Sequence, residues 1–148
     1  MPARPHLLIV EAPYYPHIAV LLRQGAERAL AAAGASFDAV SAPGAFEIPA
    51  AIAFAAKVPG RYDGFVALGC VIRGETTHYD HVCAESARGL QDLALKSGLA
   101  IGFGVLTVES EAQALVRAAP DGRDKGGEAV RACLAMIALQ RRFSGSNG

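Results

Sequence analysis

The residues most able to do chemistry lie at positions 73–78, Arg-Gly-Glu-Thr-Thr-His, directly after an apolar run at residues 64–72. The run is short, partly β-branched and almost free of charge, which predicts a buried strand. Beyond it, apolar positions recur at helical spacing, which predicts a helix. A turn between a strand and a helix start offers free backbone N–H groups and the positive end of the helix dipole. The turn therefore predicts a phosphate site, with His78 within reach of the bound group.

Other polar and aromatic residues are expected at the same edge of the sheet. They follow the other predicted strands and comprise Tyr14 and Tyr15, Phe46 and Glu47, and residues 107–110. Each of these alone is more typical of a structural role, because aromatics beside prolines pack loops and a carboxylate near a helix start is stabilised by the dipole. Open α/β sheets, however, bind ligands outside the carboxyl ends of their strands. The convergence on one edge favours a ligand site.

A metal site is the alternative interpretation of His78, His81, Cys83 and Glu85. On a helix, His78 and His81 share a face, whereas Glu85 is only partly aligned with them and Cys83 points elsewhere. The sequence has no HExxH or paired-ligand motif, so the pattern does not favour a metal. We expect His81 on the helix surface, and Cys83 and Cys133 as small core residues rather than nucleophiles.

The elements that position these residues alternate between strands and helices. Strands are predicted at residues 6–12, 36–41, 64–72 and 99–107, and helices at residues 18–33, 49–57, 79–97, 111–118 and 128–143, with a loop at 120–127. Gly34 and Gly98 are the expected helix ends, and Pro49 falls in a first helical turn. This order predicts one α/β domain over residues 1–148, with a parallel sheet covered by helices on both faces.

Composition limits the function classes. The chain has 148 residues, 52% hydrophobic residues and zero formal net charge. The length suits a single domain with a substantial core, and the neutrality indicates neither a nucleic-acid nor a membrane-surface partner. The three cysteines, at irregular spacing, indicate neither a disulfide framework nor a zinc site. We recognise no signal peptide and no transmembrane run, so a cytoplasmic location is expected.

Two long motifs stand out in the sequence. They are Pro-Gly-Ala-Phe-Glu-Ile-Pro at residues 43–49 and Gly-Cys-Val-Ile-Arg-Gly-Glu-Thr-Thr-His-Tyr-Asp at residues 69–80. With them the chain resembles the lumazine synthase family, the 6,7-dimethyl-8-ribityllumazine synthases of riboflavin biosynthesis. Residues 102–107, Arg117 and residues 124–126 also fit, so the resemblance covers about residues 8–143. It implies a flavodoxin-like three-layer α/β/α sandwich with a four-stranded parallel sheet.

The resemblance also implies a transferase and its reaction. The enzyme would condense 5-amino-6-(D-ribitylamino)uracil with 3,4-dihydroxy-2-butanone 4-phosphate to give 6,7-dimethyl-8-ribityllumazine, the penultimate step of riboflavin biosynthesis. An amine attacks a ketone to form a Schiff base, phosphate is eliminated, and a second nitrogen closes the ring. No metal or organic cofactor takes part. Histidine suits the proton transfers because an imidazole titrates near pH ~6.5, and much of the acceleration should come from holding two substrates together.

Roles carry over from the family to matching positions. The substrate-binding residues implied are Tyr14, Ala45, Phe46, Glu47, Cys70, Val71, Ile72, Glu75, Thr76, Phe103 and Arg117. Within this set, Tyr14 matches the aromatic that stacks on the pyrimidine. Residues 45–47 match the ribityl-binding segment, residues 70–72 the pyrimidine-binding segment, and residues 75–76 the phosphate turn.

The remaining matches concern catalysis and the neighbouring subunit. Phe103 matches a substrate contact from that subunit, and Arg117 a phosphate ligand from the same side. His78 matches the proton-transfer histidine, and Lys125 the lysine near the reacting groups. The resemblance thus implies a homopentamer with sites between subunits, and association with riboflavin synthase.

Two segments depart from the family pattern. The first loop has Pro-Tyr-Tyr at residues 13–15 where the family usually has Arg-Phe-Asn, although a tyrosine can still stack. Residues 118–123, Ala-Ala-Pro-Asp-Gly-Arg, lack the glycine and lysine pattern of capsid-forming members. This second departure favours an isolated pentamer, or a pair of pentamers, over a sixty-subunit shell.

A binding module is the alternative function. A flavodoxin-like protein that holds a flavin or lumazine without chemistry would have similar loops. The residues that discriminate are His78, Arg117 and Lys125, because a pure binder of an unphosphorylated ring needs none of them.

Overall fold

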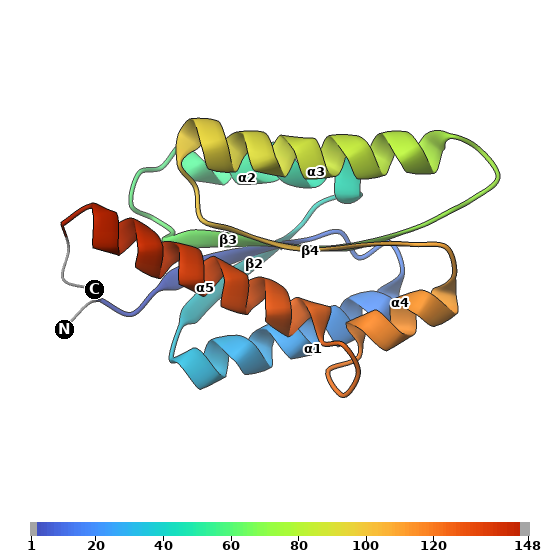
Figure 1. Ribbon diagram of the computed structural model, residues 1–148, viewed down its shortest axis with the longest axis horizontal. Helices are drawn as coiled ribbons and strands as arrows, with labels where there is room; N and C mark the ends of the chain where they lie inside the picture. Colours follow the sequence, from blue (N-terminus) through green and yellow to red (C-terminus); the bar gives the residue numbers. More distant parts are fainter. Residues whose placement is uncertain (1–2, 146–148) are drawn as a thin grey trace.

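A four-stranded parallel sheet separates two layers of helices in the computed structural model, which describes residues 3–145 (Figure 1). The described elements are β1 (His6–Glu11), α1 (Pro16–Ala33), β2 (Ser36–Ser41), the 3₁₀ helix η1 (Ala45–Glu47), α2 (Ile48–Ala56), β3 (Gly64–Ile72), α3 (His78–Ser97), β4 (Ile101–Val108), α4 (Glu111–Ala118) and α5 (Lys125–Phe143). The strand order is β2-β1-β3-β4. Helices α2 and α3 cover one face, and α1, α4 and α5 cover the other (Figure 1). This is the predicted flavodoxin-like sandwich.

The inner strands are apolar on both faces because both faces are covered. In β1, Leu7 and Ile9 belong to one buried cluster, whereas Leu8 and Val10 belong to the other. In β3, residues 64–70 are all buried. Side chains of successive strand residues point to opposite faces, so an unbroken apolar run is what a strand between two helical layers requires.

Most predicted boundaries agree with the structure. The strand predicted at 36–41, the strand at 64–72 and the helix at 111–118 have the observed bounds. Gly34 and Gly98 end α1 and α3 with φ of 68° and 66°, the left-handed conformation that glycine adopts without strain. The other ends differ by one or two residues, which is the usual uncertainty of helix and strand termini, except at α5.

Helix α5 begins at Lys125 and not, as predicted, at residue 128. Its N-cap is Asp124, whose carboxylate accepts a hydrogen bond from the Gly127 backbone N–H at 3.2 Å. Paired glycines disfavour a helix, but here they allow close packing, since a Cβ on Gly126 would lie 2.1 Å from the Leu22 carbonyl oxygen of α1. Packing against α1 therefore outweighs the local preference of residues 125–127.

The parallel strands bring the candidate residues to one edge. The loop with Tyr14 follows β1, η1 follows β2, and the turn at residues 73–77 follows β3. Strands β3 and β4 stay paired to their last residues, where Ile72 lies opposite Val108. Three segments far apart in the sequence thus end beside one another at the carboxyl edge of the sheet. Within residues 3–145, the structure contains no helix that combines the length and apolar character needed to cross a membrane.

Candidate active site

A cleft of about 620 Å³ opens at the carboxyl edge of the sheet. It is large enough for a small organic substrate, since such sites usually measure ~300–1,000 Å³. The predicted site residues that line it are Tyr14, Ala45, Phe46, Glu47, Cys70, Val71, Ile72, Thr76 and His78. The two long sequence motifs therefore line one cleft.

Four predicted site residues do not line this cleft. Glu75 lies in the turn after β3 and is exposed. Phe103 lies on the edge strand β4 with 49% of its surface exposed. Arg117 lies in the last turn of α4, where its guanidinium donates to the Gln113 carbonyl oxygen at 3.1 Å. Lys125 begins α5, with its Nζ 3.2 Å from a Glu128 carboxylate oxygen. The last two lie in the helical layer on the opposite face of the sheet from η1 and α3.

The Tyr14 side chain is exposed, and the backbone of the next residue, Tyr15, is fixed by hydrogen bonds. Tyr14 is 71% exposed and meets the Tyr15 ring edge-on at a centroid distance of 5.0 Å. The Tyr15 carbonyl oxygen accepts hydrogen bonds from Ile18 N–H at 3.0 Å and Ala19 N–H at 2.9 Å, which begins α1. Burial raises the pKa of the Tyr15 phenol above its ordinary value, and electrostatic interactions with Cys70 and Tyr14 raise it further. Because most of its surface is exposed, the Tyr14 ring can stack on a flat ligand.

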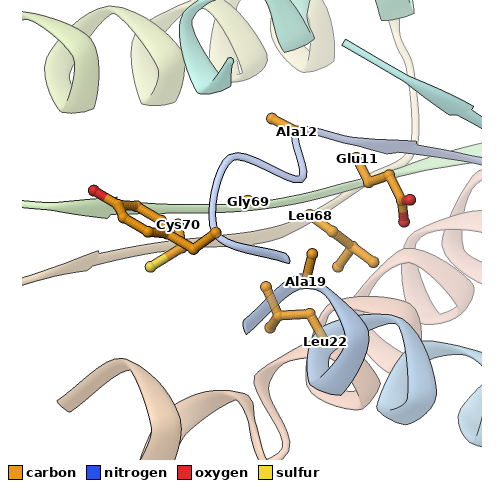
Figure 2. Close-up of a pocket in the computed structure, with 8 residues that line it drawn as sticks. Glu11, Ala12, Ala19, Leu22, Leu68, Gly69 and Cys70 are labelled. Atoms are coloured by element: carbon orange, nitrogen blue, oxygen red, sulfur yellow. The ribbon is translucent and has the colours of Figure 1, made fainter. Parts of the chain in front are cut away.

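A second space beneath this loop is too small for a substrate. It measures about 10 Å³, close to the least volume that holds one water molecule. Figure 2 shows Ala19 and Leu22 of α1 facing Leu68, Gly69 and Cys70 of β3, with Glu11 at the end of β1. The larger cleft is therefore the candidate substrate site.

Burial disfavours the thiolate form of the cysteine that lines the cleft. Cys70 is buried, and this burial raises the pKa of its thiol to about 11, so it stays protonated near neutral pH. Cys133 lies in the core as predicted, and burial raises its pKa to about 12. The predicted core position of Cys83 was wrong, because this residue is only partly buried and interacts with Tyr79 along α3.

The turn after β3 ends in the first turn of α3, at the cleft. The Thr76 Oγ1 accepts a hydrogen bond from the His78 backbone N–H at 3.3 Å, and the Thr77 carbonyl oxygen accepts one from Asp80 N–H at 3.0 Å. The Thr76 hydroxyl keeps its own proton for donation. A hydroxyl, a helix N-terminus and the exposed His78 side chain therefore meet at one place, which suits a bound anion.

The cleft has further lining residues that were not among the predicted substrate-binding or catalytic residues. Two of them, Tyr15 and Gly74, belong to segments that were expected at this edge of the sheet, and the others are Pro43, Gly44, Tyr79, His81 and Val82. His81 is exposed on the helix surface, as expected, but that surface is a wall of the cleft. The signal that could have located it is its spacing of three residues from His78, which places both on one helix face. Within residues 3–145, no three His, Cys, Asp or Glu side chains are placed to hold a metal ion.

Comparison with known proteins gives one answer over nearly the whole chain. A family model described as 6,7-dimethyl-8-ribityllumazine synthase matches residues 4–141. Proteins with this name include one from Bartonella tribocorum, 55% identical over 143 residues, or 97% of this chain and 95% of that protein. One from Sphingopyxis alaskensis is 56% identical over 138 residues (93% and 96%), and one from Agrobacterium fabrum 54% identical over 147 residues (97% and 99%). The chain therefore belongs to the 6,7-dimethyl-8-ribityllumazine synthase family.

Proposed function

We propose that this transferase makes 6,7-dimethyl-8-ribityllumazine in the cleft at the carboxyl edge of the sheet. Its substrates are 5-amino-6-(D-ribitylamino)uracil and 3,4-dihydroxy-2-butanone 4-phosphate, and its product is the penultimate intermediate of riboflavin biosynthesis. The assignment rests on one observation. The two motifs at residues 43–49 and 69–80, which lie apart in the sequence, line one cleft. We also infer, on the basis of the family alone, a cytoplasmic location and association with riboflavin synthase.

The pyrimidine is proposed to lie between the first loop and the end of β3. Tyr14 offers an exposed ring for stacking, and residues 70–72 supply backbone groups at the strand end. The ribityl chain would extend along η1, where Ala45 is buried and Phe46 is 55% exposed. Glu47 would accept hydrogen bonds from ribityl hydroxyl groups, because an ionised carboxylate acts only as an acceptor.

The four-carbon substrate is proposed to bind at the other end of the cleft. Its phosphate would meet the Thr76 hydroxyl and the N-terminus of α3, which favours negative charge. The ketone would then lie near His78, which moves protons during Schiff base formation and phosphate elimination. No covalent nucleophile is required, and holding the two substrates side by side supplies much of the acceleration.

We propose further that each site is shared between subunits of a homopentamer. Phe103, Arg117 and Lys125 match site residues of the family but do not line the cleft of their own chain. Arg117 and Lys125 lie on the opposite face of the sheet, and Phe103 is exposed on an edge strand. A neighbouring subunit that brings this surface to the cleft would complete the set, which supports a ring in which every chain contributes to two sites.

A fluorescence assay tests the proposed reaction. Purified protein is mixed with both substrates, and lumazine formation is followed by its fluorescence. Mixtures that lack one substrate, and the variant Phe46→Asp, serve as controls. We expect product only with the intact protein and both substrates. A protein that binds added lumazine but forms none would instead be the binding module.

Hybrid assemblies test the shared site. Phe46→Asp damages the cleft of its own chain, whereas Arg117→Ala damages the contribution to the next chain. At a butanone phosphate concentration well below the wild-type KM, each variant alone should have little activity. Mixed after dissociation, the two should regain part of the activity, because some hybrid sites then combine an intact cleft with an intact Arg117. Mass measurement of the wild-type protein should give a pentamer or a multiple of it, and an active monomer would refute the shared site.

A further inference from the structure

Arg73 occupies the junction between β3 and the turn that carries Thr76. Its backbone N–H donates to the Val108 carbonyl oxygen at 2.9 Å, which extends the pairing of β3 with β4 by one residue. Its side chain, 41% exposed, is not part of the cleft lining, although the neighbouring Gly74 is. Arg73 therefore adjoins the turn but does not line the site.

The guanidinium of Arg73 contacts two different elements. Its Nε donates to a Glu109 carboxylate oxygen at 2.7 Å, just after β4. A terminal nitrogen lies 3.4 Å from an Asp80 carboxylate oxygen in the first turn of α3. The guanidinium carbon also lies 4.3 Å from the centroid of the Tyr79 ring, within the range of a cation–π contact. One side chain therefore links the end of β4 to the start of α3.

The Glu109 end of this link is itself held in position. The Glu109 backbone N–H donates to the Gln113 side-chain oxygen at 2.8 Å, and the Gln113 N–H donates to the Ser110 Oγ that caps α4. At the other end, Tyr79 and Asp80 directly follow His78. Residues 74–77, which connect the two ends, are all exposed. The contacts made by Arg73 and Glu109 are therefore well placed to fix where this exposed turn lies.

We propose that Arg73 is a positioning residue, which with Glu109 holds the turn of Thr76 and His78 in the geometry that binds the substrate phosphate. This inference rests on the proposed function. A direct role in phosphate binding is not favoured, because Arg73 lies outside the cleft and its charge is already paired with two carboxylates. A planar fork that can hold two acceptors and stack on a ring suits such a link better than a lysine would.

Removing Arg73 should change substrate binding without unfolding the protein. In Arg73→Leu we expect the KM for the butanone phosphate to rise about tenfold, because displacing a binding group by ~1 Å can cost up to ~10²-fold. The KM for the pyrimidine should stay nearly unchanged. The matched control is Arg88→Leu, since Arg88 also pairs with two carboxylates, Glu85 and Asp92, but farther along α3. Exposed ion pairs contribute little to stability, so both variants should melt at nearly the same temperature.

Glu109→Ala distinguishes a positioning role of the Arg73–Glu109 contact from an effect of net charge on phosphate binding. Loss of this carboxylate makes the surroundings of the phosphate more positive, so a charge effect alone would lower the KM for the butanone phosphate. Loss of the link predicts the opposite, a rise. The double variant Arg73→Leu/Glu109→Ala should then be no worse than Arg73→Leu alone, because both changes break one contact. Glu109→Ala also remains informative if Arg73→Leu does not fold.

The outcomes distinguish this inference from the proposed function. If the wild-type protein forms no lumazine, the proposed function fails. If the wild-type is active but Arg73→Leu behaves like Arg88→Leu, only the positioning role fails. A lower KM in Glu109→Ala, or effects of the two changes that simply add, would also overturn it.

Discussion

Arg117→Ala is expected to raise the KM for the butanone phosphate by roughly ten- to hundredfold, because a hydrogen bond to a charged group contributes about 1.5–3 kcal/mol. The guanidinium stays charged at any working pH and can grip a phosphate through two N–H groups. In the structure it is half-buried, and one terminal nitrogen donates to the Gln113 carbonyl oxygen at 3.1 Å. That contact leaves most of its five N–H donors for a ligand. The KM for the pyrimidine should be nearly unchanged.

Two control variants narrow the interpretation of Arg117→Ala. Arg142→Ala removes an exposed arginine from the last turn of α5 and should leave both KM values unchanged. Glu75→Ala should also have little effect, because a carboxylate would repel the phosphate and only the backbone N–H of this exposed residue can contribute. Steady-state kinetics with each substrate varied in turn measure the split. Loss of pyrimidine affinity in Arg117→Ala would show that Arg117 serves the pyrimidine end of the cleft and that the phosphate has been placed at the wrong end.

The order of elements could be predicted from the sequence because this fold has strong local signals. The strand at 64–72 is apolar on both faces, and only a sheet covered on both sides tolerates that. The start of α5 could not be predicted, because Gly126 and Gly127 disfavour a helix when considered alone. Their role appears only where α1 packs against them, with the Leu22 carbonyl oxygen at the place of a Gly126 Cβ.

The residues that line the cleft could be predicted where they follow from the order of the strands. They could not be predicted where they depend on how a helix is rotated about its axis. Cys70 and Thr76 reach the cleft because they end a parallel strand or follow one. Tyr79 and His81 reach it only because of how α3 is turned about its axis, which depends on packing such as that of Gly89 on Pro49, where an added Cβ would come within 2.9 Å of the proline ring. The place of Arg117 relative to a cleft depends on another subunit, so spacing within one chain cannot supply it.

His78→Ala is expected to lower kcat by about 10²-fold or less, the lower end of what a general acid–base group contributes. Both KM values should change little, because the Thr76 hydroxyl and the start of α3 would still bind the phosphate. The effect stays moderate because positioning of two substrates supplies much of the acceleration. Turnover measured at saturating substrate from pH 6 to pH 8 tests this. Added imidazole should restore part of the lost rate by supplying the missing proton donor and acceptor.

His81→Ala is the matched control for this effect. His81 lies three residues further along α3, is exposed, and lines the same cleft. A general loss of positive charge or of cleft shape would slow both variants to a similar degree. Proton transfer by one positioned imidazole would slow only His78→Ala and would allow rescue by imidazole there alone. A His78→Ala enzyme as fast as the parent throughout this pH range would remove His78 from the mechanism, and the proton transfers would then belong to substrate groups or to water.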